Sequence, residues 1–277
     1  MRAQGKIVVI TGASMGIGEA LAKVFLEEGA SVVISSRDLG RAQAAQTRLF
    51  TPDRTLAVAC DVCKHEQVQA LLLAALDRFG RVDVWVNNAG HGLLDSVSEM
   101  SPAEFRRLMD TNLFGAVDCM QAVIPVMKQQ GSGVILNIAS VAGHIPVPYM
   151  AAYSASKFAL IALSKAARLE LLGTGVSVIA ISPGYIATDF GANAAKGKDA
   201  MRMSAAARNR MSADDCARVV FNGYLKNGRE VIVPWTYKIP IFLYDNFPGL
   251  TERFMRRMLK PAGQVFAQIE SQKKTKS

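Results

Sequence analysis

Short runs of β-branched and other apolar residues alternate along the chain with longer stretches whose apolar residues recur every three or four positions. The short runs predict buried strands, and the longer stretches predict amphipathic helices. We expect strands at Ile7–Thr11, Ser31–Ser36, Leu56–Ala59, Val82–Asn87, Val134–Ile138, Ser177–Ser182 and Glu230–Val233. We expect helices at Gly16–Glu28, Leu39–Leu49, Glu66–Phe79, Pro102–Gln129, Ala151–Leu172 and Ala213–Leu225.

This alternation of strands and helices is typical of βαβ units that build a parallel sheet. Strands with near-continuous apolar content, such as Ile7–Ile10, fit burial on both faces of such a sheet. Right-handed crossovers then predict a three-layered, doubly wound α/β fold of the Rossmann type, whose ligand binds beyond the carboxyl ends of the strands. The composition shifts near Trp235, after which basic and bulky apolar residues dominate. We therefore expect a main domain over residues 1–237 and a short, basic, helical extension over residues 238–277.

Composition narrows the classes of protein to which the chain can belong. Half of its 277 residues are hydrophobic and a fifth are charged, which supports a substantial core and argues against a disordered chain. The sequence has no apolar run of spanning length and no apolar stretch of signal-peptide length near Met1, so we expect a cytoplasmic protein. The net charge of +9 fits a polyanionic cofactor or anionic lipid better than nucleic acid, because no basic run is interleaved with aromatic residues.

Cys60 and Cys63 form a C-x-x-C pair, which raises the question of a metal or redox site. A structural zinc site needs four ligands, and the sequence has no second cysteine pair. The histidines His65, His91 and His144 are widely separated, and the cysteines are too few for a disulfide framework. We expect no metal site.

A glycine-rich turn follows the first predicted strand and leads into the first predicted helix, with the sequence Thr11-Gly12-Ala13-Ser14-Met15-Gly16-Ile17-Gly18. Glycines permit a tight turn and a close approach of the backbone, so the free amides at the start of the helix can bind a pyrophosphate. The spacing differs from G-x-G-x-x-G and resembles the T-G-x-x-x-G-x-G of the short-chain dehydrogenase/reductase family.

Further motifs match that family in order and spacing. They are Asn87-Asn88-Ala89-Gly90 after the fourth strand, Asn112 in the next helix, Ser140 after the fifth strand, Tyr153-Ser154-Ala155-Ser156-Lys157, and Pro183-Gly184 followed by Thr188. Ala139 departs from the pattern, since many relatives have a second serine there. The resemblance implies an oxidoreductase that interconverts an alcohol and a carbonyl with a nicotinamide cofactor.

Tyr153 and Lys157 are four residues apart, so on one helix they share a face. A neighbouring ammonium and a positive nicotinamide favour the phenolate, so we expect the pKa of Tyr153 to fall toward the working range. The resemblance implies that Tyr153 exchanges the proton of the substrate oxygen and that Ser140 hydrogen-bonds that oxygen. It also implies that Lys157 holds the nicotinamide ribose and that Asn112 holds a water connecting Lys157 to solvent.

The end of the second predicted strand, Ser35-Ser36-Arg37, bears on the choice of cofactor. Folds that prefer NAD place a carboxylate here, whereas Ser36 can donate to a 2′-phosphate and Arg37 can pair with it. Asp38, one residue on, is expected to cap the second helix. We therefore expect NADP(H), and since cells keep that pool reduced, carbonyl reduction is the expected direction.

The resemblance assigns contacts to the rest of the cofactor. Asp61 is expected at the adenine edge or, alternatively, as a cap of the next helix. Ile186 and Thr188 are expected at the carboxamide, although Thr188 could instead be a loop hydroxyl near Asp189. The full expected set is Gly12, Ser14, Gly16, Ile17, Gly18, Ser36, Arg37, Asp61, Val62, Asn88, Ala89, Gly90, Tyr153, Lys157, Pro183, Gly184, Ile186 and Thr188.

Residues expected near the reacting centre are mostly apolar, which predicts a lipophilic ketone or aldehyde as the substrate. They are His91, Leu93, His144, Ile145, Val147, Tyr149, Met150, Tyr185 and Phe190, of which His144, Tyr149 and Tyr185 are the candidate substrate contacts. Residues 191–207 are small and basic, as in a lid. In relatives the helices around residues 112–129 and 152–172 form an interface, so we expect a homodimer or homotetramer.

Two other functions remain open. One is a redox-inactive NADPH sensor or scaffold on the same fold, which would be expected to lose Tyr153 or Lys157, although both are present. The other is a sugar epimerase or dehydratase of the extended branch of the family. That branch needs a longer substrate domain than the chain supplies after Val233.

The extension contains a candidate amphipathic helix over residues 246–260, with Asn246 and Pro248 at its start and Pro261 after its end. One half of its helical wheel carries Leu250, Phe254, Met255, Met258 and Leu259, and the other half carries Glu252, Arg253, Arg256, Arg257 and Lys260. Residues 238–277 contain eight Lys or Arg and three Asp or Glu, which is +5 of the +9. This pattern fits peripheral contact with an anionic membrane, or packing on the protein's own core or a partner subunit.

Overall fold

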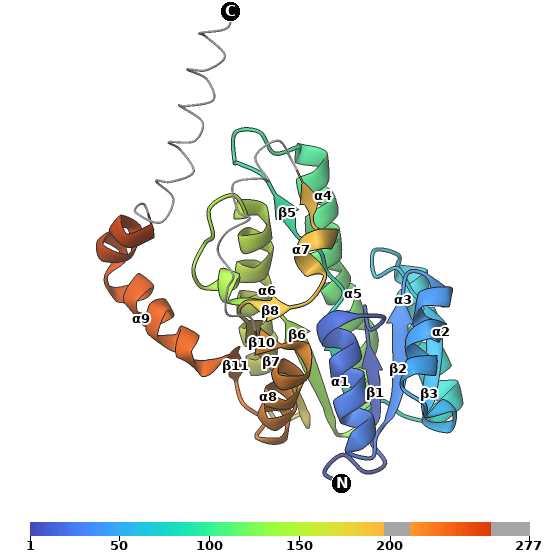
Figure 1. The fold of residues 1–277 in the computed structure, drawn as a ribbon. Helices are drawn as coiled ribbons and strands as arrows, with labels where there is room; N and C mark the ends of the chain where they lie inside the picture. The colour runs from blue at the N-terminus through green and yellow to red at the C-terminus, as the bar shows by residue number, and fades with distance from the viewer. Residues whose placement is uncertain (197–210, 256–277) are drawn as a thin grey trace, which may run out of the picture.

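A sheet of seven parallel strands forms the centre of the computed structural model, which describes residues 1–196 and 211–255 (Figure 1). The strand order is β11-β7-β6-β4-β1-β2-β3. The strands are β1 (Ile7–Ile10), β2 (Ser31–Ser36), β3 (Thr55–Ala59), β4 (Val84–Asn87), β6 (Gly133–Ile138), β7 (Val176–Pro183) and β11 (Glu230–Val233). Because the order runs outward in both directions from β1 and β4, the sheet is doubly wound, and the predicted fold class is confirmed.

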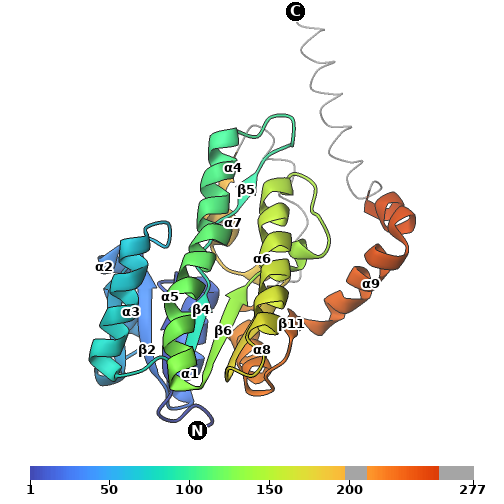
Figure 2. The same cartoon turned by 180° about the vertical axis from the view of Figure 1, so that it is seen from behind.

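Helices cover both faces of the sheet (Figures 1 and 2). One layer contains α1 (Gly16–Glu27), α2 (Leu39–Arg48) and α8 (Ala213–Leu225), and the other contains α3 (His65–Phe79), α5 (Gly115–Gln130) and α6 (Ala151–Glu170). Neighbouring residues of β1 point into different cores: Val8 packs with Phe25 and Phe221, whereas Val9 packs with Trp85. This two-sided burial explains why β1 is apolar at all four of its positions.

The structure confirms the predicted strands of the main sheet and the predicted helices that cover it. It differs from the sequence prediction in three places. The single helix expected over Pro102–Gln129 consists of α4 (Pro102–Met109), a π-helical turn (Asp110–Phe114) and α5. Two small sheets, β5 (Leu93–Leu94) with β9 (Ala195–Lys196) and β8 (Ile186–Ala187) with β10 (Met211–Ser212), join loops that follow the main strands. In the third place, the helices after the main strands, α7 (Phe190–Asn193) and α9 (Lys238–Asn246), were not predicted.

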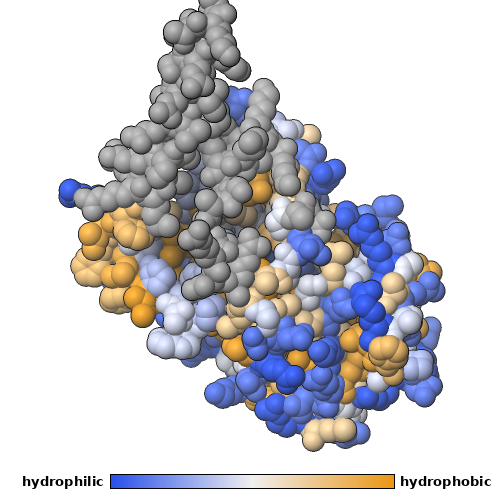
Figure 3. All heavy atoms as spheres, viewed as in Figure 1, coloured by the Kyte–Doolittle hydropathy of each residue, from blue (hydrophilic) through white to orange (hydrophobic). Residues whose placement is uncertain are grey.

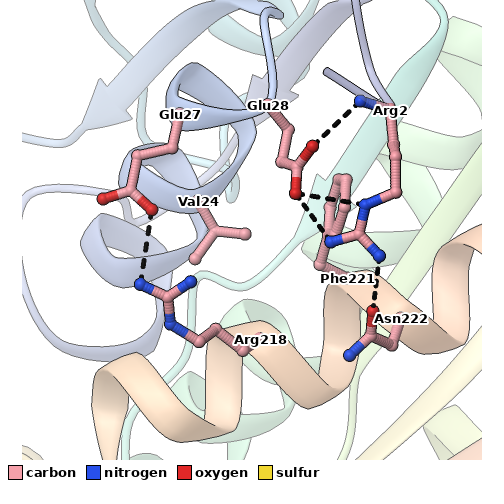
Figure 4. Close-up of a pocket in the computed structure, with 7 residues that line it drawn as sticks. All are labelled: Arg2, Val24, Glu27, Glu28, Arg218, Phe221 and Asn222. Atoms are coloured by element: carbon pink, nitrogen blue, oxygen red, sulfur yellow. Dashed lines mark hydrogen bonds and ion pairs between the residues drawn. The ribbon is translucent and has the colours of Figure 1, made fainter.

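A cavity of about 250 Å³ lies at the amino-terminal end of the strands, between α1 and α8 (Figure 4). Arg2 forms an ion pair with Glu28 at 2.6 Å and donates to Asn222 at 3.1 Å. Arg218 of α8 pairs with Glu27 of α1 at 3.4 Å. The hydrogen bond from Arg2 lowers the pKa of the Glu28 carboxyl to about 2. These pairs fasten the first residues of the chain to α1, and α1 to α8.

Beyond β11 the chain forms a 3-10 turn (Trp235–Tyr237), α9, and a helical stretch over residues 248–255 that projects from the body of the molecule (Figures 1 and 2). Of the two residues predicted at the start of the amphipathic helix, Pro248 is confirmed, whereas Asn246 is the last residue of α9 and does not cap the later helix. Met258, Leu259, Arg256, Arg257 and Lys260 of the predicted amphipathic helix lie outside the described residues. Within residues 1–196 and 211–255, no helix is long and apolar enough to cross a bilayer. The domain division at residue 237 stays a prediction.

Candidate active site

The glycine-rich turn after β1 is locked to the turn that follows β4. Asn88 donates from its side-chain amide to the carbonyls of Thr11, at 3.0 Å, and of Gly12, at 2.9 Å. The Thr11 hydroxyl accepts from the backbone amides of Asn88 and Ala89. Gly12 has a φ of +63°, and a Cβ there would lie 2.9 Å from the Cα of Ala89. A side chain at Gly18 would lie 2.7 Å from the Gly12 carbonyl oxygen, so both positions require glycine.

The first turn of α1 can hold a phosphate. Among the described residues no side chain caps this helix at Met15, so backbone amides of its first turn are available to an anion. Gly16 has a φ of +62°, and the methyl group of Thr188 lies 3.4 Å from where its Cβ would be. The Ser14 carbonyl accepts from Arg48 at 3.0 Å. The turn thus exposes backbone amides and carries no bulky side chains, and Thr188 lies on one side of it. These features fit the pyrophosphate of a dinucleotide.

Ser36 ends β2 and Arg37 follows it, close to the glycine-rich turn. Ser36 is buried, and its hydroxyl accepts from the Asp38 amide at 3.4 Å. Asp38 caps α2 by accepting from the Arg41 amide at 3.0 Å, as the sequence predicted. Arg37 is exposed and has no ion pair with any described residue. No carboxylate of the described residues therefore competes with an anionic ligand for its charge.

Asp61 braces the turn before α3 rather than capping the helix, whose N-cap is Lys64. Its carboxylate accepts from the Cys63 amide at 3.1 Å, and its own amide donates to Gln67 at 2.7 Å. Burial raises the pKa of Cys60 to about 11 and also raises the pKa of Cys63, which disfavours the thiolates that bind metals. Within the described ranges, no three potential metal-ligating side chains gather.

The four candidate catalytic residues come from three neighbouring elements at the carboxyl edge of the sheet. Tyr153 and Lys157 lie on α6, Ser140 follows β6, and Asn112 lies in the π-helical turn. The Lys157 ammonium is 5.7 Å from the centre of the Tyr153 ring and donates to the Ile138 carbonyl at 2.8 Å. The Ser140 hydroxyl donates to a backbone carbonyl at 3.3 Å, which is a long bond for a hydroxyl.

Burial moves the pKa values of both Tyr153 and Lys157. It raises the pKa of Tyr153 to about 12, although a hydrogen bond with Ser140 opposes the rise. It lowers the pKa of Lys157 to about 8. The direction for Tyr153 is opposite to the sequence expectation, because the loss of solvent around the ring outweighs the hydrogen bond with Ser140. At neutral pH the tyrosine is protonated and the lysine is mostly charged.

Asn112 fastens the π-helical turn to two other parts of the site. Its side-chain amide accepts from the His91 backbone N–H and donates to the His91 carbonyl, both at 3.0 Å. It also donates to the Ser156 hydroxyl at 3.2 Å. The Asn112 side-chain oxygen and the Lys157 ammonium lie 3.0 and 3.7 Å from the Cβ position of Gly90, so they flank the same glycine. The amide is thus engaged in positioning, and its water-holding role stays a prediction.

The remaining candidate cofactor residues also lie at this edge. Val62 is buried and packs against Gly115. Ile17 and Ile186 pack on the core between the sheet and α1. Pro183 is the last residue of β7, and Gly184 follows it. Sequence reasoning missed Thr11, whose hydroxyl organises the β4 turn, and Arg48, which reaches the phosphate turn from α2. Thr11 stands in the glycine motif and could have been found there; Arg48 has no local signal.

The candidate substrate contacts fall in two places. The His144 ring lies 2.6 Å from the Glu230 carboxylate and 3.1 Å from the Ser182 hydroxyl, so it is held against the edge of the sheet. Tyr149 has a positive φ of 62°, and Tyr185 is 42% exposed. Their roles in substrate binding stay predictions. Glu230 was not predicted to meet His144, because the two are far apart in the sequence.

Phe190 covers the candidate proton carrier. Its ring lies 5.4 Å from the ring of Tyr153, and a Cβ at Gly92 would meet it at 3.2 Å. Phe190 begins α7 (Phe190–Asn193), which leads into β9 and its pairing with β5. The segment that follows β7 therefore closes over Tyr153 with an apolar side chain.

A doubly wound parallel sheet with a phosphate-binding glycine turn, and with serine, tyrosine and lysine gathered at its carboxyl edge, defines a dinucleotide-dependent oxidoreductase class. The family model described as short chain dehydrogenase matches residues 6–199, and the chain belongs to that family. Its fold binds a nicotinamide dinucleotide, and the protein is an oxidoreductase of this type.

The chain is similar to characterised and uncharacterised members of the family. An uncharacterised oxidoreductase of Staphylococcus epidermidis is 38% identical over 67% of this chain and 83% of that protein. A short-chain dehydrogenase/reductase of Burkholderia phymatum in complex with NAD superposes with a TM-score of 0.84 at 26% identity, over 91% and 96% of the two chains. The 3-ketoacyl-(acyl-carrier-protein) reductase of Brucella melitensis complexed with NADH has a TM-score of 0.75 at 32% identity, over 83% and 97%.

Proposed function

We propose that this protein interconverts a lipophilic ketone or aldehyde and its alcohol with NADP(H), with Tyr153 as the acid and base. The observation that carries the proposal is the burial of Tyr153 next to Lys157 and Ser140 at the carboxyl edge of the sheet. A tyrosine with a pKa of about 12 is a proton donor at neutral pH, which suits reduction of a carbonyl.

When bound, the reduced cofactor supplies a hydride to the carbonyl carbon. Tyr153 donates its proton to the carbonyl oxygen, which becomes the hydroxyl of the product. Ser140 exchanges its long bond to the Pro183 carbonyl for a hydrogen bond to that oxygen as negative charge develops there. The Lys157 ammonium stabilises the phenolate that Tyr153 leaves behind. Asn112 holds the π-helical turn against α6 through Ser156, which keeps Lys157 in register with Gly90.

The preference for NADP(H) is supported by Ser36 and Arg37. The similar structures from Burkholderia and Brucella are complexes with NAD and NADH, so relatives by themselves do not favour the phosphorylated cofactor. In this chain the residue at the end of β2 is a serine, and the following arginine is exposed and unpaired among the described residues. A guanidinium pairs with a phosphate through two hydrogen bonds, whereas the ribose hydroxyl of NAD offers no such charge.

A lipophilic substrate is supported by the apolar surroundings of Tyr153. Its ring packs in a cluster with Leu93, Leu108 and Ala142, and Phe190 lies over it. A charged substrate would lose its hydration in such a lining and would form no ion pair there, which is unfavourable. His144, Tyr149 and Tyr185 are the proposed contacts to the remainder of the substrate.

The proposed homodimer or homotetramer is supported by apolar side chains on the layer of α5 and α6. Phe114, Phe158, Leu169 and Leu172 are between 40% and 71% exposed on this layer. Burial of such side chains against a second copy would remove them from water.

The test is a panel of ketones, aldehydes and alcohols, followed by the absorbance of the reduced nicotinamide. We expect Tyr153→Phe to bind NADPH normally and to lose about 10²- to 10⁴-fold in turnover, since only the proton carrier is removed. Tyr224→Phe is the matched control, because Tyr224 packs on Phe25 and Phe221 between α1 and α8. Turnover of Tyr153→Phe within tenfold of the wild type contradicts the assignment. NADPH binding without turnover on any carbonyl would favour a redox-inactive sensor.

A further inference from the structure

Six large apolar side chains are exposed to solvent along the carboxyl-terminal arm, residues 235–255. We call these six side chains the arm face. They are Trp235, Ile239, Phe242, Phe247, Leu250 and Phe254, each between 53% and 67% exposed. Figure 3 shows apolar side chains gathered where α9 lies. Exposed apolar surface of this kind marks an interaction site in a folded protein, because isolated exposed residues are common and contiguous patches are not.

The described part of the body, residues 1–196 and 211–234, does not cover the arm face. Only Ile241 of α9 is buried, and both views of the fold show α9 and residues 248–255 leading away from the sheet (Figures 1 and 2). The arm is attached at its root: the Tyr237 ring packs directly on Gly184, and the Gly184 amide donates to the Val233 carbonyl at 2.7 Å. Its position is therefore fixed while its apolar residues stay free to meet another surface.

The charge of the extension indicates what that surface is. Residues 238–277 carry +5 of the net +9, and three of the cations, Arg253, Arg256 and Arg257, lie within or directly after the arm. A second copy of the chain carries the same charge, so a symmetric contact of arm against arm brings like charges together. An anionic bilayer attracts those cations, and its interface accepts indole and phenyl rings such as those of Trp235 and Phe242.

We propose that the arm face docks this protein on an anionic phospholipid bilayer, with the aromatic and aliphatic side chains of residues 235–254 inserted at the headgroup boundary. The docking surface runs from Trp235 through α9 to Phe254, so it begins before the amphipathic stretch that the sequence predicts. Both apolar burial and the attraction of Lys and Arg to anionic lipid contribute to binding of this kind.

Docking also orients the candidate active site, and this part rests on the proposed function. The arm root contacts Gly184, and the preceding residue, Pro183, accepts the hydrogen bond of Ser140. The arm therefore leaves the fold at the same edge of the sheet as the candidate active site. A protein bound in this way holds this edge near the bilayer, and the substrate class is a carbonyl lipid or another carbonyl that partitions into the membrane.

The test is co-sedimentation of the full chain with vesicles of phosphatidylcholine alone and of phosphatidylcholine with phosphatidylglycerol. We expect binding to the anionic vesicles that weakens with salt, because screened charges attract less. The variant Phe242→Ser/Leu250→Ser should lower the partition coefficient by at least about tenfold, since it removes two inserted side chains. The matched control is Phe50→Ser/Leu73→Ser, whose residues are 85% and 56% exposed elsewhere on the surface and should leave binding unchanged.

Light scattering and turnover separate the remaining outcomes. If the wild type does not bind anionic vesicles, or both double variants bind equally, the proposal is wrong. If Phe242→Ser/Leu250→Ser instead halves the mass of the particle in solution, the occupant of the arm face is a second copy and the lipid proposal is overturned. Turnover of a small water-soluble carbonyl should be the same in both double variants. Vesicle binding without turnover on any carbonyl would contradict the proposed function and leave the docking surface standing.

Discussion

At the amino-terminal end of the sheet, the two arginines that line the cavity between α1 and α8 each face a glutamate, Arg2 with Glu28 and Arg218 with Glu27 (Figure 4). At the carboxyl end, Lys157 is 5% exposed, and only burial shifts its pKa. Arg37 at the same end is exposed and has no ion pair within the described part of the chain. The two cavity arginines thus face carboxylates, whereas Lys157 and Arg37 face none among the described residues. Arg48, also at the carboxyl end, differs from these two, since it pairs with Glu19 at 2.6 Å.

This difference in pairing separates cations that join segments of the fold from cations that are available to a ligand. Exposed ion pairs contribute little to stability, about 0–1 kcal/mol, and serve to fasten segments together. Burial of the Lys157 ammonium is unfavourable, because a pKa of about 8 in place of 10.5 costs roughly 3 kcal/mol. A fold tolerates that cost where the charge acts on a substrate oxygen or an anionic cofactor. Four predictions test this difference, from the largest expected effect to the smallest.

The largest effect is expected from Lys157→Met, which removes the buried charge and keeps the length of the side chain. Turnover should fall by about 10²-fold or more, because the Tyr153 phenolate loses its stabilising ammonium. The free energy of unfolding at pH 7 should rise by up to about 3 kcal/mol, less what the bond to the Ile138 carbonyl contributes. Urea unfolding and steady-state rates measure the two changes, and Lys128→Met, an exposed lysine on α5, is the control.

The pH dependence of that gain follows from the direction of the shift. The folded chain releases the Lys157 proton near pH 8, whereas the unfolded chain keeps it to about pH 10.5, so the unfolded state binds more protons between these values. The stability contributed by this group therefore rises with pH across that window. The advantage of Lys157→Met should be present below pH 8 and disappear near pH 10.5. An advantage that is constant with pH would show that charge burial is not its cause.

The second effect concerns Arg37, the exposed cation without a carboxylate. Arg37→Ala should weaken NADPH by roughly tenfold to 150-fold, which corresponds to 1.5–3 kcal/mol for a charge-assisted pair. NADH should change little, because it lacks the 2′-phosphate. Arg218→Ala is the matched control at the other end of the sheet, where the guanidinium already faces Glu27. Equal losses for NADPH and NADH, measured by titration calorimetry, would show that Arg37 does not contact the phosphate.

The third effect is the pH dependence of carbonyl reduction. Because the pKa of Lys157 is about 8, the rate should fall by up to tenfold per pH unit above about pH 8, as the ammonium that stabilises the phenolate is lost. Below that pH the rate should stay nearly level, since Tyr153 remains protonated. Rates with saturating cofactor and substrate between pH 6 and about 10 measure this. A rate that increases through this range would place the controlling group elsewhere.

The elements at the two ends were not equally predictable from the sequence. The strands and the glycine turn depend on local signals, apolar runs and glycines at fixed spacing, so β2, α8 and β11 match their predicted bounds residue for residue. The π-helical turn is held by hydrogen bonds between Asn112 and the backbone of His91, which is distant in the sequence. The apolar periodicity of residues 102–129 gives no sign of this contact. The Tyr153 pKa also required the fold, since burial determines its direction.

The same limit applies to the paired arginines and to the arm. Arg2 meets Asn222 across 220 positions, and no local pattern indicates that contact. Helix α9 contains Pro240 and mixed apolar and polar residues, so the helical wheel marked only the segment after Asn246. A local pattern can predict an element and its motif, whereas the partner of an isolated charge depends on how distant segments pack.

The smallest effect is expected at the paired end, where Glu27→Gln and Arg218→Gln form a double-mutant cycle. The pair joins α1 to α8 at 3.4 Å, and the side chains are 43% and 60% exposed, so water and salt screen it. The coupling energy should be about 0.5 kcal/mol or less in urea unfolding and should shrink further at about 1 M salt. Both single variants should keep wild-type turnover and NADPH affinity. A coupling above about 1.5 kcal/mol, or a change in cofactor binding, would mean that this end also takes part in function.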